Sequence, residues 1–290
     1  MRSLLFTPAN NPRRMDKALT LHADAVIVDL EDACPISEKG SARAHVVTAL
    51  QRPRHCLGYV RINALSTEFA HDDICAVVRR GTDGIMLPKV ESPDQIKTVD
   101  WLIAVLERQQ GLPAGAIDLI PLIETGTGLV NAEAIGRAVP RIKRLAFGAA
   151  DFTFDLGLRW SREETELLPF RGSLALASRA AGIEPPIDLA WIRTDDREGF
   201  MNSVRWGRTL GFQGKLCIHP DQITAINEAF APAPDEVAHA QRVVDAFQRQ
   251  EAHGSAAFIL DGTLIDYALL AKARRVLDTA RRIAAGDRRA

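Results

Sequence analysis

The chain has 290 residues, of which 47% are hydrophobic and 25% are charged, a composition typical of globular proteins. Its 36 Lys and Arg residues balance 37 Asp and Glu residues to a net charge of −1, which argues against a nucleic-acid partner. We find no apolar run of about 18–20 residues and no signal peptide, so neither membrane insertion nor export is expected. The four cysteines lack Cys-x-x-Cys spacing, and we expect reduced thiols in a cytoplasmic protein.

Eight short β-rich segments run through residues 1–218. Several are almost entirely apolar, such as Ala25-Val26-Ile27-Val28, which is typical of parallel strands buried on both faces. The predicted strands span residues 3–6, 25–30, 58–62, 84–87, 118–123, 144–147, 187–191 and 214–218.

Helical segments with polar first residues lie between these strands, and we predict helices over residues 93–110, 131–138, 162–181 and 195–210. The alternation indicates βαβ units, and eight such units predict an α/β protein with a (β/α)8 TIM barrel. A doubly wound open sheet is the alternative fold. No glycine-rich phosphate-binding motif follows a strand, so the usual nucleotide-binding sites are not indicated.

The segment after the eighth strand predicts helices over residues 220–229, 235–250 and 266–285, with a loop or short hairpin over residues 254–262. Residues 281–290 are rich in Arg and Ala and predict a frayed helix tail. One helix completes the barrel. We therefore expect a barrel over residues 1–230 and a C-terminal helical extension over residues 231–290.

Polar side chains gather where the predicted strands end, which is where barrel enzymes carry their chemistry. Each has a structural explanation of its own: an acid caps a helix or braces a loop, Arg61 forms an ion pair, and His219 before Pro220 is a turn residue. Their convergence on one barrel mouth favours a site instead. The group comprises Asp29, Glu31, Asp32, Arg61, Asn63, Lys89, Glu91, Glu124, Asp151 and His219.

Glu124 and Asp151 follow adjacent strands, so their carboxylates are expected to point into the same mouth. Neither segment offers a His or Cys ligand, and two carboxylates without a soft ligand suit Mg²⁺ or Mn²⁺ better than zinc. Arg61 is able to hold a carboxylate through two parallel hydrogen bonds. Together these residues predict a site for an oxygen-rich acid such as a 2-keto acid.

Seven segments in chain order carry a family resemblance: residues 2–8, 29–32 with Lys39 and Arg43, 60–63, 86–91, 123–125, 148–152 and 217–220. The sequence resembles the citrate lyase β-subunit-like family, within the wider group of malyl-CoA and citramalyl-CoA lyases and HpcH/HpaI-type aldolases. The resemblance implies a (β/α)8 barrel with a C-terminal extension. It also implies a homotrimer, or a higher multiple, whose subunits share active sites.

The resemblance also implies roles for individual residues. Glu124 and Asp151 become the Mg²⁺ ligands, with Mn²⁺ as an alternative, and Arg61 becomes the catalytic clamp on the keto acid's carboxylate. Asp266, in the extension, becomes the acid/base that reaches into a neighbouring subunit. Substrate contacts are implied for Phe6, Lys17, Glu124 and Ala150, and positioning of the metal's ligands and waters for Glu31, Asp32 and Lys89.

Two of these positions bear on the substrates. Phe6 and Lys17 match positions near the CoA chain. Ala150 occupies a position that is Glu in many citrate lyase subunits and Ala in members similar to malyl-CoA lyase, which favours the latter group.

The implied reaction is reversible cleavage of a 3-hydroxyacyl-CoA, such as malyl-CoA, citramalyl-CoA or citryl-CoA, to acetyl-CoA and a 2-keto acid. One alternative is a CoA-independent class II aldolase that releases pyruvate from a hydroxy-keto acid. Another is a non-catalytic subunit of a larger lyase complex, while a phosphotransfer barrel has no supporting motif. The sequence leaves open which keto acid is used and whether the CoA is free or carried by a partner protein.

Overall fold

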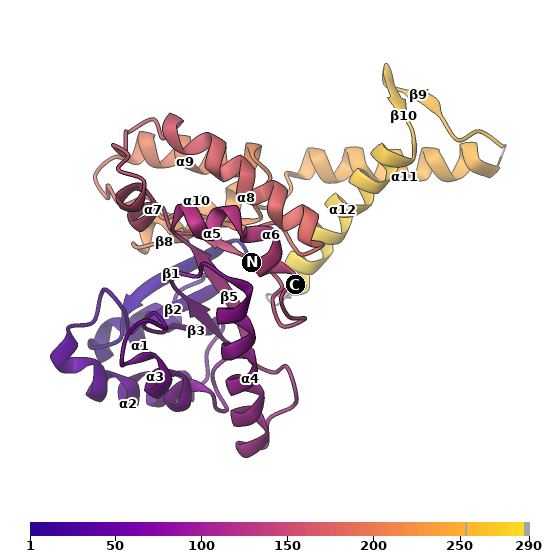
Figure 1. Ribbon diagram of the computed structural model, residues 1–290. Coiled ribbons are helices and arrows are strands. Elements are labelled where there is room, and N and C mark those ends of the chain that lie inside the picture. Colours follow the sequence, from indigo (N-terminus) through magenta and orange to yellow (C-terminus); the bar gives the residue numbers. More distant parts are fainter. Residues whose placement is uncertain (253, 287–290) are drawn as a thin grey trace. The chain divides into compact units, whose positions relative to one another are not determined.

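The computed structural model describes residues 1–252 and 254–286, and the chain divides into two compact units, Met1–Glu228 and Ala229–Ala290. The first unit is a closed barrel of eight parallel strands, β1 to β8 in order, and β1 pairs with β8 to close it (Figure 1). The predicted (β/α)8 fold is therefore confirmed.

The barrel strands are short and lie close to the predicted ranges. β6 (Ala146–Phe147) and β7 (Ile187–Asp188) are the exceptions, because each has only two residues. Arg144, predicted to begin the sixth strand, instead turns a fully buried guanidinium toward Asp118 and Glu184. The remaining strands are β1 (Ser3–Pro8), β2 (Ala25–Asp29), β3 (Leu57–Arg61), β4 (Gly84–Leu87), β5 (Asp118–Ile123) and β8 (Gly214–Cys217).

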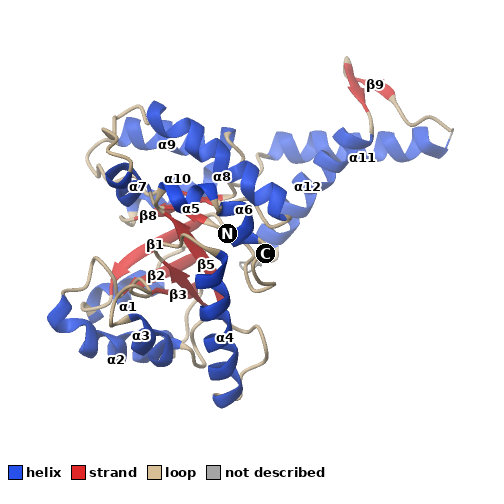
Figure 2. Cartoon of the chain, in the orientation of Figure 1, coloured by secondary structure: helices blue, strands red, loops and turns tan. Residues whose placement is uncertain are grey.

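Helices surround these strands, as Figure 2 shows. The helix predicted over residues 162–181 begins later than expected, since Glu164 adopts a left-handed φ of 56° and the α-helix starts at Leu168 with Pro169 in its first turn. The helices are α1 (Pro12–Thr20), α2 (Lys39–Leu50), α3 (Ala70–Val77), α4 (Pro93–Gln109), α5 (Gly126–Val130), α6 (Ala132–Gly136), α7 (Ala149–Asp155), α8 (Leu168–Ala181), α9 (Arg197–Thr209) and α10 (Asp221–Ala229), with 3-10 turns η1 (Ile36–Glu38) and η2 (Thr165–Leu167).

The barrel interior is filled by one cluster of apolar side chains. Successive residues of a strand point to opposite faces, so a residue two positions after an inward one also points inward. Asp29, Arg61 and Glu124 each lie two positions after a member of this cluster, which brings them into the barrel at the carboxyl ends of the strands. The cluster includes Leu4, Ala25, Ile27, Leu57, Tyr59, Met86, Ile120, Leu122, Ala146, Ile187 and Leu216.

The second unit consists of α11 (Pro234–Ala252), the antiparallel strands β9 (Phe258–Leu260) and β10 (Thr263–Ile265), and α12 (Tyr267–Ala284). The predicted loop or hairpin is therefore a hairpin, displaced toward the C-terminus. Val243, Phe247 and Leu277 belong to a separate apolar core of this unit. Part of the predicted helix tail, residues 287–290, lies outside the described residues.

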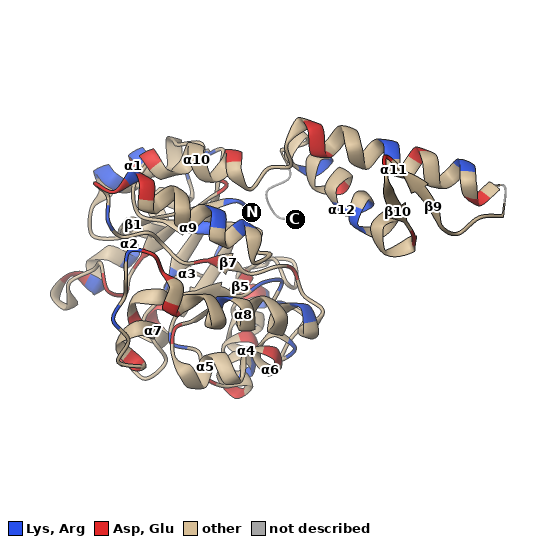
Figure 3. Ribbon diagram, turned by 90° about the horizontal axis from the view of Figure 1, so that it is seen from above, with Lys and Arg blue, Asp and Glu red and all other residues tan. Residues whose placement is uncertain are grey.

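Charged residues of both signs are interspersed along the helices (Figure 3). This agrees with the balanced charge of the sequence. Cys34, Cys75 and Cys217 are free thiols, and the Cys56 thiol donates to the carbonyl oxygen of Leu19. In residues 1–252 and 254–286 we find no helix that is both long enough and apolar enough to cross a membrane.

Candidate active site

Glu124 follows β5 and points into the barrel mouth, where it is only 1% exposed. Its Oε1 accepts a hydrogen bond of 2.7 Å from the backbone N–H of Lys89. Gly148 leaves room for the carboxyl group, since a Cβ at this position would lie 2.5 Å from Glu124 Oε2. Burial, together with the negative charges of Glu31 and Asp151, raises the pKa of Glu124 to about 8. A cation beside Glu124 would therefore stabilise its ionised form.

Lys89, two residues after β4, connects the acids of the site. It has a left-handed backbone with a φ of 53°, which is uncommon for a residue other than glycine. Its Nζ donates to Glu31 Oε1 at 2.8 Å and lies 3.8 Å from Asp151 Oδ1. Burial opposes the charge on Lys89, but the hydrogen bond to Glu31 and the proximity of Asp32 and Asp151 raise its pKa. Three residues predicted to position the site, Glu31, Asp32 and Lys89, thus lie together.

Arg61 ends β3 and is held in place on two sides. Its Nε and Nη2 donate to the two carboxylate oxygens of Asp29 at 2.8 and 2.6 Å, and its Nη1 lies 3.0 Å from Glu31 Oε2. The guanidinium carbon lies 5.0 Å from the ring centroid of Phe6, which is within cation–π range. Burial lowers the pKa of Arg61, but the hydrogen bonds to Asp29 and the charges of Asp29 and Glu31 outweigh this effect. The pKa of Arg61 is therefore raised above its ordinary value. A substrate carboxylate that binds Arg61 therefore shares the guanidinium with Asp29 and Glu31.

A cavity of about 420 Å³ lies over these residues. Four acids line it, namely Asp29, Asp32, Glu124 and Asp151, against Arg61 as the cation. An anionic substrate therefore needs a metal ion or a further cation to offset this charge. The cavity is also lined by Phe6, Ala33, Leu122, Phe147, Gly148, Ala149, Ala150, Trp160, Ala190, Ile192, Leu216 and Ile218.

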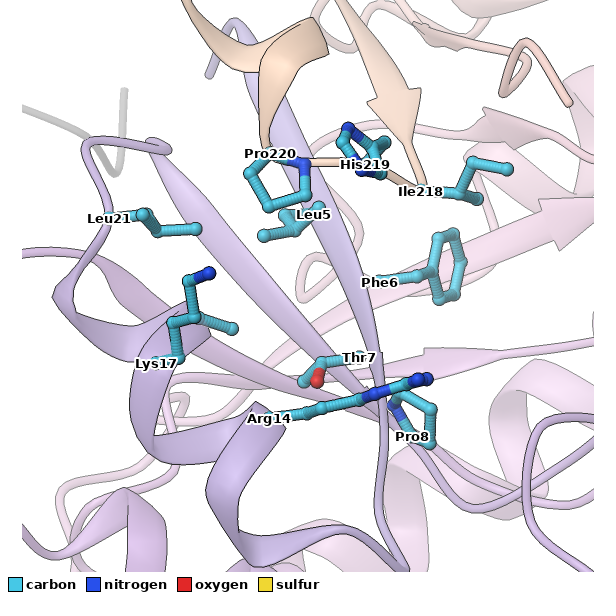
Figure 4. A pocket seen from close by; sticks show the side chains of 11 residues that line it. Leu5, Phe6, Thr7, Pro8, Arg14, Lys17, Leu21, Ile218, His219 and Pro220 are labelled. Atoms are coloured by element: carbon cyan, nitrogen blue, oxygen red, sulfur yellow. The ribbon is translucent and has the colours of Figure 1, made fainter. Parts of the chain in front are cut away.

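A second cavity, of about 340 Å³, lies between β1, α1 and the connection from β8 to α10 (Figure 4). Arg14 and Lys17 from α1 and His219 after β8 line it and give it a basic character. Phe6 and Ile218 line both cavities, so the two cavities adjoin. A ligand with an anionic tail and a reactive head can therefore occupy both.

The remaining predicted residues lie in different places. Ala150 is exposed and lines the larger cavity. Asp266 belongs to the second unit, where it is exposed and caps α12 by accepting the N–H of Leu269 at 2.9 Å. The structure thus gathers the predicted residues of the barrel around the two cavities, and the catalytic role of Asp266 stays a prediction.

Sequence reasoning missed the apolar lining of the larger cavity. Trp160, Ala190 and Ile192 carry no signal of a site, because single apolar residues are indistinguishable from core residues before the fold is known. The ion pair of Asp29 with Arg61 could have been predicted, because the two residues lie opposite each other when β2 pairs with β3.

Glu124 and Asp151 are the residues suited to a metal ion. Among the described residues, no three or more His, Cys, Asp or Glu side chains form a ready-made metal cage. Mg²⁺ does not need one, since it usually binds through one or two carboxylates and completes its coordination with water and substrate oxygens. The buried carboxyl of Glu124 and the partly exposed Asp151 fit that pattern.

Comparisons with known proteins identify the family. The model of the HpcH/HpaI aldolase/citrate lyase family matches residues 2–220. The citrate lyase subunit beta of Leuconostoc mesenteroides subsp. cremoris is 36% identical over 281 residues, which cover 96% of this chain and 93% of that protein. A (3S)-malyl-CoA thioesterase of Cereibacter sphaeroides is 34% identical over 286 residues, or 98% of this chain and 96% of its own length.

Among solved structures, the protein CitE of Mycobacterium tuberculosis in complex with magnesium, acetoacetate and coenzyme A is similar at a TM-score of 0.76. It is 30% identical, and the match covers 97% of this chain and 98% of that one. The chain belongs to the HpcH/HpaI aldolase/citrate lyase family. The enzyme class predicted from the sequence, a carbon–carbon lyase related to the citrate lyase β-subunit, is thereby confirmed.

Proposed function

We propose that this protein is a Mg²⁺-dependent carbon–carbon lyase that reversibly cleaves a 3-hydroxyacyl-CoA thioester into acetyl-CoA, or a close acyl-CoA, and a 2-keto acid. The observation that carries the proposal is the adjoining of the two cavities at Phe6 and Ile218. One cavity has the carboxylates and arginine that a metal-bound keto acid requires. The other has the basic residues that suit the phosphates of CoA.

Glu124 and Asp151 are the residues that would hold Mg²⁺, with Mn²⁺ as an alternative. The bound ion supplies Lewis-acid stabilisation of the negative charge that develops on the keto oxygen. Arg61 adds a fixed positive charge and binds the keto acid's carboxylate. Asp29 keeps the guanidinium oriented, because its carboxylate accepts hydrogen bonds from both Nε and Nη2.

In the condensation direction, one carbon–hydrogen bond breaks and one carbon–carbon bond forms. The α-carbon of the acyl-CoA loses a proton to a base and bonds to carbon 2 of the keto acid, while the keto oxygen gains a proton and becomes a hydroxyl. In cleavage that carbon–carbon bond breaks, the hydroxyl loses its proton, and the enolate carbon regains one. We assign the proton transfer at carbon to Asp266 of a neighbouring copy, in a homotrimer or a higher multiple.

The basic cavity accounts for binding of the CoA portion. Lys17 and Arg14 lie on the same helix, α1, and their side chains line this cavity together with His219. Paired cations of this kind form charge-assisted hydrogen bonds to phosphate oxygens. Phe6, at the junction, lies beside the thioester end of the ligand in this arrangement.

The test is lyase activity on malyl-CoA and citramalyl-CoA in the presence of Mg²⁺. We expect acetyl-CoA release by the unmodified protein and loss of turnover in Glu124→Ala. Full turnover in that variant would contradict the metal assignment. Cleavage of a free hydroxy-keto acid, with normal activity in Asp266→Asn, would favour a CoA-independent aldolase, and keto-acid binding without any turnover would favour a non-catalytic subunit.

A further inference from the structure

The larger cavity is polar on one side only. Asp29, Arg61 and Glu124 reach it from β2, β3 and β5, and Asp151 reaches it from the first turn of α7. Among the residues placed around this cavity, Arg61 is the single cation, and two of its nitrogens donate to Asp29. Lys89, beside the cavity, donates its Nζ to Glu31 instead. Arg61 also lies 3.0 Å from Glu31 through its Nη1, so this polar wall offers one cation, already in contact with two acids, for at most one substrate carboxylate.

The opposite wall is apolar. Phe6 comes from β1, Ala190 and Ile192 follow β7, and Leu216 and Ile218 lie in and directly after β8. Since β7, β8 and β1 are consecutive neighbours in the closed barrel, these five side chains form one continuous apolar wall. A carboxylate against this wall would lose its hydration without gaining a partner, whereas a methyl group would gain burial.

We propose that the keto acid of this enzyme is a 2-oxo monocarboxylate with a short alkyl substituent, and that a 2-oxo dicarboxylate is rejected. The inference rests on the proposed function above and narrows its substrate class. A keto carbon carries an oxygen, a carboxylate and a third substituent. The polar wall takes the first two, so the third lies against the apolar wall. The cavity volume of about 420 Å³ leaves space beyond a methyl group.

The experiment condenses acetyl-CoA, in the presence of MgCl₂, separately with glyoxylate, pyruvate, 2-oxobutyrate and oxaloacetate. Liquid chromatography with mass spectrometry identifies each 3-hydroxyacyl-CoA, and mass separates citryl-CoA from citramalyl-CoA formed after oxaloacetate decarboxylates. We expect kcat/KM for pyruvate to exceed that for glyoxylate by about tenfold and that for oxaloacetate by at least about 100-fold. A kcat/KM for oxaloacetate equal to or above that for pyruvate would overturn the inference.

Ile192 provides a gain-of-function test, because it is 49% exposed and tolerates a longer side chain. Ile192→Arg places a second cation on the apolar wall. We expect the ratio of oxaloacetate to pyruvate kcat/KM to rise by at least about tenfold, while the uncharged control Ile192→Gln leaves the ratio near its starting value. An unchanged ratio in folded Ile192→Arg would count against the apolar wall as the origin of selectivity.

Calorimetric binding of the keto acids to the Mg²⁺-loaded protein, without acyl-CoA, separates this inference from the proposed function. If pyruvate binds more tightly than oxaloacetate but no keto acid yields product, the inference about the cavity stands and the lyase proposal fails. If product forms but oxaloacetate binds at least as tightly as pyruvate, the lyase proposal stands and the inference is overturned.

Discussion

Glu124 makes the stability of the metal-free protein depend on pH. Its pKa is about 8 in the folded chain, against an ordinary value of 4.5, so the folded state binds this proton more tightly than the unfolded state. Proton binding by Glu124 therefore contributes fully to the free energy of unfolding below about pH 4.5. This contribution is lost as the pH rises through about 8. At about 1.36 kcal/mol per pKa unit, the difference between the pKa values of 4.5 and about 8 corresponds to about 5 kcal/mol of stability.

The variant Glu124→Gln tests this prediction, since the amide keeps an acceptor for the Lys89 N–H and removes the titrating group. Urea unfolding of chelator-treated protein at pH 5, 7 and 9 gives the free energy of unfolding at each pH. We expect the wild-type protein to lose several kcal/mol more than the variant over this range. The exposed Glu68→Gln serves as a matched control and should follow the wild-type curve. Parallel curves for wild type and Glu124→Gln would refute the account of the buried carboxyl.

Three further predictions concern the other parts of the site. Lys17→Ala should raise KM for the acyl-CoA by about tenfold with little change in kcat. The exposed Arg13→Ala in the same helix should leave KM unchanged. Equal KM values for the two variants in steady-state kinetics would count against the basic cavity as the binding site of CoA. Asp29→Asn should lower the free energy of unfolding by about 3 kcal/mol, because it leaves the buried Arg61 with Glu31 as a weaker remaining partner, and a loss below about 1 kcal/mol in urea unfolding would contradict this. Asp266→Asn should lower kcat by at least about 100-fold at unchanged melting temperature, since Asn caps helices as well as Asp does; normal turnover would remove Asp266 from the mechanism.

The fold was largely predictable because strand-to-helix alternation and continuous apolar strands leave few alternatives to a closed parallel barrel. The first three helices were not assigned from the sequence. α2 buries its first residue, Lys39, whose Nζ donates to the carbonyl oxygens of Leu30 and Glu31. Such a residue breaks the apolar pattern that would reveal the helix, because its role is defined only by contacts with a distant loop.

The candidate site was predictable in its residue types and less so in its geometry. Glu124, Asp151 and Arg61 stand out in the sequence because charged groups at the ends of buried strands are unusual. The space that Gly148 leaves for Glu124 and the apolar wall that includes Ile192 depend on which strands become neighbours. Both features arise from the pairing of strands around the barrel, and local sequence patterns carry no information about them.

The most direct test of the central claim is the rate at which the purified full-length protein releases acetyl-CoA from citramalyl-CoA, measured with Mg²⁺ and again with excess chelator. We predict release together with stoichiometric pyruvate when Mg²⁺ is present, and loss of that release when the ion is removed. Equal rates under both conditions would contradict the metal-dependent lyase, as would free CoA appearing in place of acetyl-CoA.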